Sequence, residues 1–342
     1  MLRRRAISRK KIFADMNASE AVLVCDKRGW SCKTSTGAGK SHVIVSKRPA
    51  LRPDQALGTT LSAIAKSILA EAKDAITDPE RGTAAAVHDF RKAIKRWRSY
   101  LRFLTPHFGE GCKALQAEAR DTAKKLGGAR DLRSTIDALE DIREEAYELN
   151  DTALATISAR IKSLQAEAEA REIGASGFEA IADEVSKWSL TVSLWNFNRI
   201  EFSEISASLG QGYRRARNAM PDDWREADEE ELHDFRKRVI DHRYQMELVE
   251  PLWPRMAKLW VDEAQRLRDA LGMHRDLANL RALTGPLQPL ARFRSKLVPP
   301  VERRQEVHLA KAAKLAARIF ADKPKSFRTR LDALWNSGTD AE

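Results

Sequence analysis

The sequence has few cysteines and no long apolar run. Only three of its 342 residues are cysteines, Cys25, Cys32 and Cys112, and none belongs to a C-x-x-C pair. Three cysteines cannot form a disulfide framework, so we expect a reducing, cytoplasmic compartment. No stretch approaches the roughly 18 consecutive apolar residues that a membrane-spanning helix needs, and we therefore expect no membrane span.

The acidic residues do not balance the basic ones. The sequence contains 60 lysines and arginines against 49 aspartates and glutamates, a formal net charge of +11. Residues 1–50 hold 12 basic and 3 acidic residues, whereas the remaining 292 residues hold 48 and 46. We expect residues 1–50 to be a basic tail that is disordered or that includes sequence upstream of the natural start. A basic excess indicates a polyanionic partner such as nucleic acid, an anionic membrane or polyphosphate.

From Pro53 onward the apolar residues recur every three or four positions, as they do in amphipathic helices. One stripe runs from Leu57 to Ala72 and another from Val87 to Leu104. Prolines and glycines interrupt the stripes, and no alternating run is long enough to indicate a sheet. The sequence predicts an all-α protein of about eight to ten helices packed as bundles. We expect four tryptophans in the core: Trp97, Trp253, Trp260 and Trp335.

An internal repeat divides the helical part, residues 51–342, into two halves. The block Val87–Lys92 (VHDFRK) reappears as Leu232–Lys237 (LHDFRK), an offset of 145 residues, and an Arg-Asp-Leu block downstream recurs at the same offset. Chance rarely places two blocks in one register, so we predict two homologous bundles, residues 51–190 and 191–342. We expect them to be related by a pseudo-twofold, with a basic groove or pore between them.

The helix that begins near Val87 carries positive charge along one face. On a helical wheel its apolar residues fill one side. The opposite side carries a histidine and five basic residues: His88, Arg91, Lys92, Lys95, Arg98 and Arg102. Like charges at this spacing repel by a few tenths of a kcal/mol per pair, so an ordinary exposed helix alternates their signs. From Arg91 to Arg102 the row extends about 16 Å at 1.5 Å per residue, which suits a linear polyanion. Arg96 lies at the edge of this face, and we expect it in solvent or at the rim.

The second copy keeps only part of the basic row. Four residues retain their places: His233, Arg236, Lys237 and Arg243. Three other positions change, with Ile240, Asp241 and Glu247 standing where the first copy has Lys95, Arg96 and Arg102. The end of the row is therefore lost. Arg214 and Arg217, on the preceding helix, complete the candidate contacts to a polyanion.

In this order the motifs resemble the CHAD domain, the conserved histidine α-helical domain. The resemblance covers about residues 51–335 and rests on both His-Asp-Phe-Arg-Lys blocks and on the Leu-Gly pairs and aspartates that follow them. It implies two helical bundles around a basic central groove or pore. It also implies binding of inorganic polyphosphate by the histidines and basic residues of the two motif helices. Some members carry an enzymatic triphosphate-tunnel domain, but the preceding residues contain no E-x-E-x-K signature.

Two other functions stay open from the sequence. The His88-Asp89 and His233-Asp234 doublets resemble part of the metal site of HD-type phosphohydrolases, although neighbouring helical residues point about 100° apart. Nucleic-acid binding is the second alternative, which the nearly neutral body and the absence of an aromatic stacking platform disfavour.

We expect a non-enzymatic protein that uses no metal or cofactor, with nucleic acid as a weaker competitor of polyphosphate. A cytoplasmic protein of this kind could associate with polyphosphate granules. Histidine has an ordinary pKa of about 6.5, so His88 and His233 could join a bound polyanion as cations. We therefore predict tighter binding as the pH falls from about 8 to 6.

Overall fold

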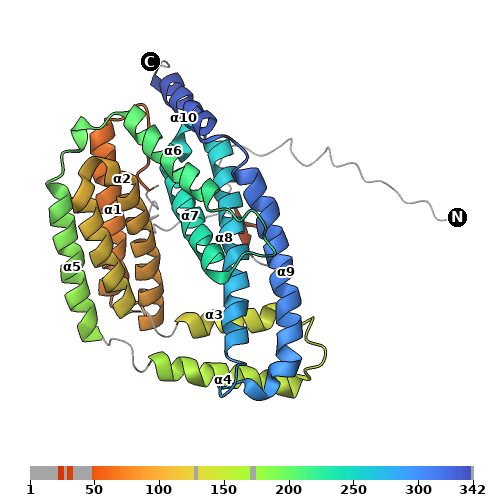
Figure 1. Cartoon of the computed structure of the whole chain (residues 1–342). Helices are drawn as coiled ribbons and strands as arrows, with labels where there is room; N and C mark the ends of the chain where they lie inside the picture. Colours follow the sequence, from red (N-terminus) through yellow and green to blue (C-terminus); the bar gives the residue numbers. More distant parts are fainter. Residues whose placement is uncertain (1–21, 27–28, 34–47, 127–129, 170–174, 340–342) are drawn as a thin grey trace. The chain divides into compact units, whose positions relative to one another are not determined.

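A computed structural model of the chain (Figure 1) describes residues 22–26, 29–33, 48–126, 130–169 and 175–339. Residues 1–47 form a separate unit. Within it, β1 (Val22–Asp26) pairs antiparallel with β2 (Gly29–Lys33). The other residues of this unit lie outside the described ranges, so the expectation of a disordered tail stays a prediction.

Residues 48–342 form the second unit, and its described elements are all helical. The first half contains five α-helices: α1 (Leu57–Thr77), α2 (Thr83–Lys125), α3 (Arg130–Asp141), α4 (Asp151–Glu169) and α5 (Ala175–Ser193). The second half contains five more: α6 (Phe202–Asn218), α7 (Glu229–Leu248), α8 (Pro254–Ala282), α9 (Arg294–Ile319) and α10 (Pro324–Thr339). Three short 3₁₀ helices occur in the connections: η1 (Phe197–Arg199), η2 (Glu250–Leu252) and η3 (Ala291–Phe293). The predicted all-α fold is confirmed.

The motif helix α2 bends part-way along its length. Pro106 lies inside the helix, where it removes a backbone N–H donor. Three residues later Gly109 adopts a positive φ of 48°, a conformation that glycine enters without strain. α2 therefore consists of two helical parts, and the first of them carries the basic row.

The 145-residue offset relates the helices as well as the sequence motifs. By this offset α1 corresponds to α6, the first part of α2 to α7, α4 to α9 and α5 to α10. The packing partners repeat too, because α1 contacts α2 and α5 as α6 contacts α7 and α10. α8 spans, as one continuous helix, the places that the second part of α2 and α3 occupy in the first half.

Two apolar clusters hold this unit together. The larger contains the predicted inner face of α2, including the fully buried Phe90, Trp97 and Leu101. The smaller joins α3 and α4 to the adjoining ends of α8 and α9, an arrangement visible in Figure 1. Among the described helices none is both long and apolar enough to cross a membrane.

One tryptophan departs from the predicted core. Trp97 is buried, and Trp260 and Trp335 pack partly buried against the larger cluster. Trp253 is 50% exposed, so its placement in the core was wrong. It is the N-cap residue of α8, directly after η2, and this junction holds its ring at the surface.

Candidate functional site

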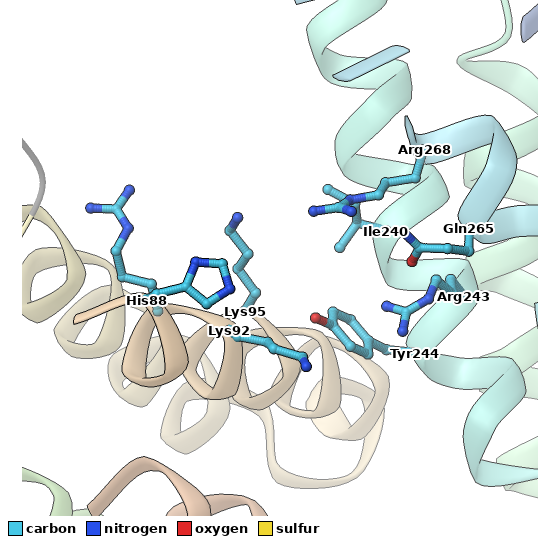
Figure 2. A pocket seen from close by; sticks show the side chains of 9 residues that line it. His88, Lys92, Lys95, Ile240, Arg243, Tyr244, Gln265 and Arg268 are labelled. Carbon is cyan, nitrogen blue, oxygen red and sulfur yellow. The ribbon is translucent and has the colours of Figure 1, made fainter. Parts of the chain in front are cut away.

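Side chains from both halves of the helical unit line a hollow of about 360 Å³. Its lining comprises His88, Arg91, Lys92 and Lys95 of α2, Ile240, Arg243 and Tyr244 of α7, and Gln265 and Arg268 of α8. We call these nine residues the basic hollow. Figure 2 shows the α2 side chains on one side of the space and those of α7 and α8 on the other. Five of the nine are lysine or arginine and none is a carboxylate, so the lining itself is positive. Two of these cations are paired with carboxylates outside the lining, Arg243 with Glu247 and Arg268 with Asp269.

Local interactions orient Arg243 in the α7 wall. Its Nη2 donates a hydrogen bond to Glu247 Oε1 at 2.7 Å, one turn further along the helix. Its guanidinium also lies 4.7 Å from the centre of the Tyr244 ring, within the range of a cation–π contact. The side chain is therefore held in place before any ligand arrives.

Arg91 has a structural partner as well as a place in the basic hollow. Its Nη1 donates to the main-chain oxygen of Leu126 at 2.8 Å, at the end of α2, where the helix has no backbone donors left to offer. In the second half Arg236 lies against Gly272, where an added Cβ would come within 3.3 Å of its Nη2. In each copy the motif arginine thus contacts a residue of the Leu-Gly pair, Leu126 in the first copy and Gly272 in the second.

The far end of the row on α2 meets acidic residues from α7. Arg102 Nη2 donates to Asp241 Oδ1 at 2.5 Å, and Arg96 Nε lies 4.0 Å from Glu247 Oε2. By the repeat Asp241 is the counterpart of Arg96 and Glu247 that of Arg102, so the two pairs are reciprocal. The acidic substitutions in the second copy therefore join the two halves.

We expected Arg96 in solvent or at the rim of the basic face, and this expectation was wrong. It is buried, and its Nη1 donates to Glu71 Oε1 at 3.1 Å. Burial, and then the neighbouring Arg48, lower the pKa of Arg96, whereas Glu71 and Glu247 oppose that change. A helical wheel shows the direction in which a side chain points, but it does not show that α1 and α7 cover this edge.

The start of the second motif copy lies apart from the basic hollow, whereas Arg243, further along α7, lines it. His233 and Arg236 line a different hollow of about 320 Å³ together with His274 and Arg275. Arg275 Nη1 contacts both ring nitrogens of His233. Burial and then the charge of Arg275 lower the pKa of His233 to about 4. Without a ligand His233 is therefore neutral at neutral pH, and its cationic role stays a prediction.

The other predicted contacts are dispersed. Lys237 is exposed, and its Nζ lies 3.7 Å from Asp234 Oδ1. Arg98 is half-buried, and its pKa is lowered by burial and then by the nearby Arg102. Arg214 is exposed on α6, and Arg217 is half-buried there. None of these four residues lines either of the two hollows.

Sequence reasoning missed the contribution of α8. Gln265 and Arg268 line the basic hollow, although the offset relates them to Arg120 and Ala123, which lie outside the motif. The repeat therefore gave no signal for them. Arg268 and Arg275 are seven residues apart, which places them on one face of a helix, and this spacing was the available clue.

The His-Asp doublets use their carboxylates in ion pairs. Asp89 Oδ2 accepts a hydrogen bond from Arg81 Nη1 at 3.1 Å, and Asp234 lies near Lys237 and Arg238. Within the described part of the chain, no group of three or more His, Cys, Asp or Glu side chains is placed to hold a metal ion.

Comparison with known proteins places the chain in a family. The family model of the CHAD domain matches residues 61–285. The chain belongs to the CHAD domain family. All nine residues of the basic hollow lie within the CHAD match.

Two solved structures resemble the CHAD fold of this chain. The CHAD domain from the plant Ricinus communis is 22% identical, with a TM-score of 0.50, over 86% of this chain and 95% of that one. PptA from Streptomyces chartreusis is 16% identical, with a TM-score of 0.57, over 78% of this chain and 100% of that one. At these identities the likeness is one of fold. No curated protein matches the chain.

Proposed function

We propose that this CHAD protein is a non-enzymatic binding protein for inorganic polyphosphate and that the basic hollow is its central contact. The observation that carries the proposal is the lining itself, in which five lysines and arginines and one histidine meet from both halves with no carboxylate among them. The resemblance of the motifs to the CHAD domain, which implies polyphosphate binding, supports this choice of ligand.

The chemistry of the lining suits a chain of phosphates. Arginine presents a planar fork of donors to phosphate oxygens, and lysine adds a flexible point charge. Lys92 and Lys95 extend from α2, while Arg243 and Arg268 face them from the other side (Figure 2). A linear polyanion in this space would be neutralised from two directions. Much of the affinity would then come from released counterions and would fall steeply with salt.

Nucleic acid is the second candidate ligand, and the lining disfavours it. Single-stranded nucleic acids gain affinity when their bases stack on aromatic side chains. Tyr244 is the one Phe, Tyr or Trp among the nine, and the guanidinium of Arg243 already lies over its ring. We expect polyphosphate to displace RNA or DNA of equal charge from the protein.

The proposal is tested by removing one charge from each wall. Lys92→Gln combined with Arg268→Gln should weaken binding of long-chain polyphosphate by about 2–4 kcal/mol, because each charge-assisted contact contributes roughly 1–2. The measurement is a gel shift with labelled polyphosphate over a series of salt concentrations.

A matched control removes the same charge elsewhere on the surface. Lys258 and Arg266 are exposed on α8, and each is paired with an acid on the same helix. Lys258→Gln with Arg266→Gln should change affinity less than about threefold, because salt screens distant exposed charges. Equal losses in both double variants would overturn the site. Release of orthophosphate by the pure protein would overturn the non-enzymatic assignment.

A further inference from the structure

The basic row of α2 ends at a carboxylate that comes from the other half. Asp241 of α7 is only 7% exposed, and its Oδ1 accepts the 2.5 Å hydrogen bond from Arg102. Its main-chain oxygen accepts a hydrogen bond from Ser99 Oγ at 3.2 Å, so the backbone of α7 is fixed against α2 at this point. The carboxylate therefore has a defined position at the far end of the row.

More than one arginine surrounds this carboxylate. Arg98 lies close enough to interact with both Arg102 and Asp241, and so does Arg215 of α6. We call Arg98, Arg102 and Arg215 the arginine cluster. The buried Nε atoms of Arg98 and Arg102 have no hydrogen-bond partner, so the one carboxylate does not satisfy all the donors of the cluster. Burial first, and then positive neighbours, also lower the pKa of both Arg98 and Arg215. Arg215 is exposed and the Arg102 side chain is 27% exposed, so solvent reaches the cluster.

A carboxylate and a phosphate compete for the same donors. Both present oxygens that accept paired hydrogen bonds from a guanidinium fork. In the repeat Asp241 stands where the first copy has Arg96, so this chain has an anion at a position that is basic in its other half. A polyanion that follows the row from the basic hollow would meet this fixed anion at the crossing of α2 and α7.

We propose that Asp241 is a specificity-determining residue, an internal anion that occupies the arginine cluster and ends the polyanion path at the α2–α7 crossing. The inference rests on the proposed function of the basic hollow. The native protein then contacts a bound chain mainly through the hollow. Neutralising Asp241 opens the cluster to further phosphates.

The test compares a short and a long ligand on Asp241→Asn. Tripolyphosphate is the short probe and long-chain polyphosphate the long one. We expect the variant to bind the long chain about fivefold to thirtyfold more tightly, as one added charge-assisted contact would give. For the variant, the slope of log affinity against log salt concentration should become steeper by about one. Binding of tripolyphosphate should change less than about twofold relative to the control below.

The control is Asp262→Asn, which makes the same charge change at an exposed position on α8, paired with Lys258. An equal gain in this control would assign the effect to net charge and overturn the proposal. An unchanged affinity of Asp241→Asn for long chains would also overturn it.

A second variant keeps the proposal testable if Asp241→Asn does not fold. Arg215→Gln leaves the native carboxylate in place, and we expect it to change affinity for the long chain less than about twofold. A tenfold loss would show that the cluster already binds phosphate in the native protein, which contradicts the proposal. If Lys92→Gln with Arg268→Gln has no effect, the proposed function fails. If only the Asp241 and Arg215 results disagree, this inference fails alone.

Discussion

At the scale of single residues, the side chains near the site have partners that also stabilise the fold. Arg91 lines the basic hollow while it holds the carbonyl of Leu126, and Arg243 is positioned by Glu247. The helical periodicity of the sequence predicted which face of α2 carries these charges. The same periodicity also places Glu247 one turn from Arg243. It could not predict Leu126 as the partner of Arg91, because the bend of α2 brings these two residues together.

A buried histidine gives a prediction at this scale. His242 Nε2 accepts a hydrogen bond from Trp260 Nε1 at 2.9 Å, and burial lowers the pKa of His242 to about 3. The unfolded chain therefore takes up a proton at His242 below its ordinary pKa of about 6.5, whereas the folded chain does not. Between about pH 6.5 and 3 this group should lower the free energy of unfolding by up to about 1.4 kcal/mol per pH unit.

The measurement is urea unfolding as a function of pH. His242→Gln keeps an acceptor for Trp260 and has no titrating ring, so its stability should fall less steeply below pH 6.5 than that of the native chain. Parallel curves for the two proteins would show that His242 is protonated in the folded state.

At the scale of elements, the two halves use one helical pattern with local differences. The breaks at Pro106 and Gly109 were visible in the sequence, and they bend α2. The continuity of α8 was harder to predict, because Gly272 occurs inside it. The first half has two consecutive glycines at this point, whereas the second has Gly272 followed by Met273. A single glycine costs a helix only about 1 kcal/mol, so α8 continues through Gly272.

A close approach between elements gives a prediction at this scale. Gly58 of α1 faces η1, and an added Cβ would lie 2.9 Å from both the N and the Cα of Asn198. Backbone atoms cannot move aside as a flexible side chain can, so Gly58→Ala should lower the free energy of unfolding by about 1–3 kcal/mol. Gly111→Ala is the matched control. Its Cβ would meet Trp195 at an ordinary 3.6 Å, and the helix should gain up to about 1 kcal/mol. Thermal unfolding of both variants gives the comparison, and similar losses would contradict it.

At the scale of the whole helical unit, two of the contacts between the halves differ in chemistry. The first is the crossing of α2 and α7, with its reciprocal ion pairs. The second is the smaller apolar cluster, where α3 and α4 contact α8 and α9. The repeat predicted two related halves from the sequence. It did not predict this second contact, since the internal packing of one half does not specify what it meets in the other.

An ion-pair network at the second contact gives a prediction at this scale. Asp141 of α3 accepts hydrogen bonds from Arg304 Nη2 at 2.8 Å and His308 Nε2 at 2.6 Å, both on α9. Burial alone would raise the pKa of Asp141, but these hydrogen bonds hold it below its ordinary value. The stabilisation is therefore present above an ordinary aspartate pKa of about 3.9 and is lost as the pH falls through the lowered value.

We expect Asp141→Asn to lower the free energy of unfolding at pH 7 by about 1–3 kcal/mol, because three hydrogen bonds to the carboxylate, two from Arg304 and one from His308, are weakened in a partly exposed site. Chemical unfolding measures the change, and Asp262→Asn, from an exposed pair, should cost less than about 1 kcal/mol. Polyphosphate affinity should stay the same in both folded variants. A stability loss no larger than that of the control would show that the network does not join the halves.

The reciprocal pairs at the α2–α7 crossing make the two halves non-interchangeable. In a protein assembled from two copies of the first half, Arg96 of each copy would face Arg102 of the other, and both ion pairs would become repulsions. Two copies of the second half would bring Asp241 against Glu247 in the same way. A duplicated half of this chain would therefore not reconstitute the fold by pairing with itself, whereas the two different halves, expressed as separate polypeptides, carry the complementary charges that select each other.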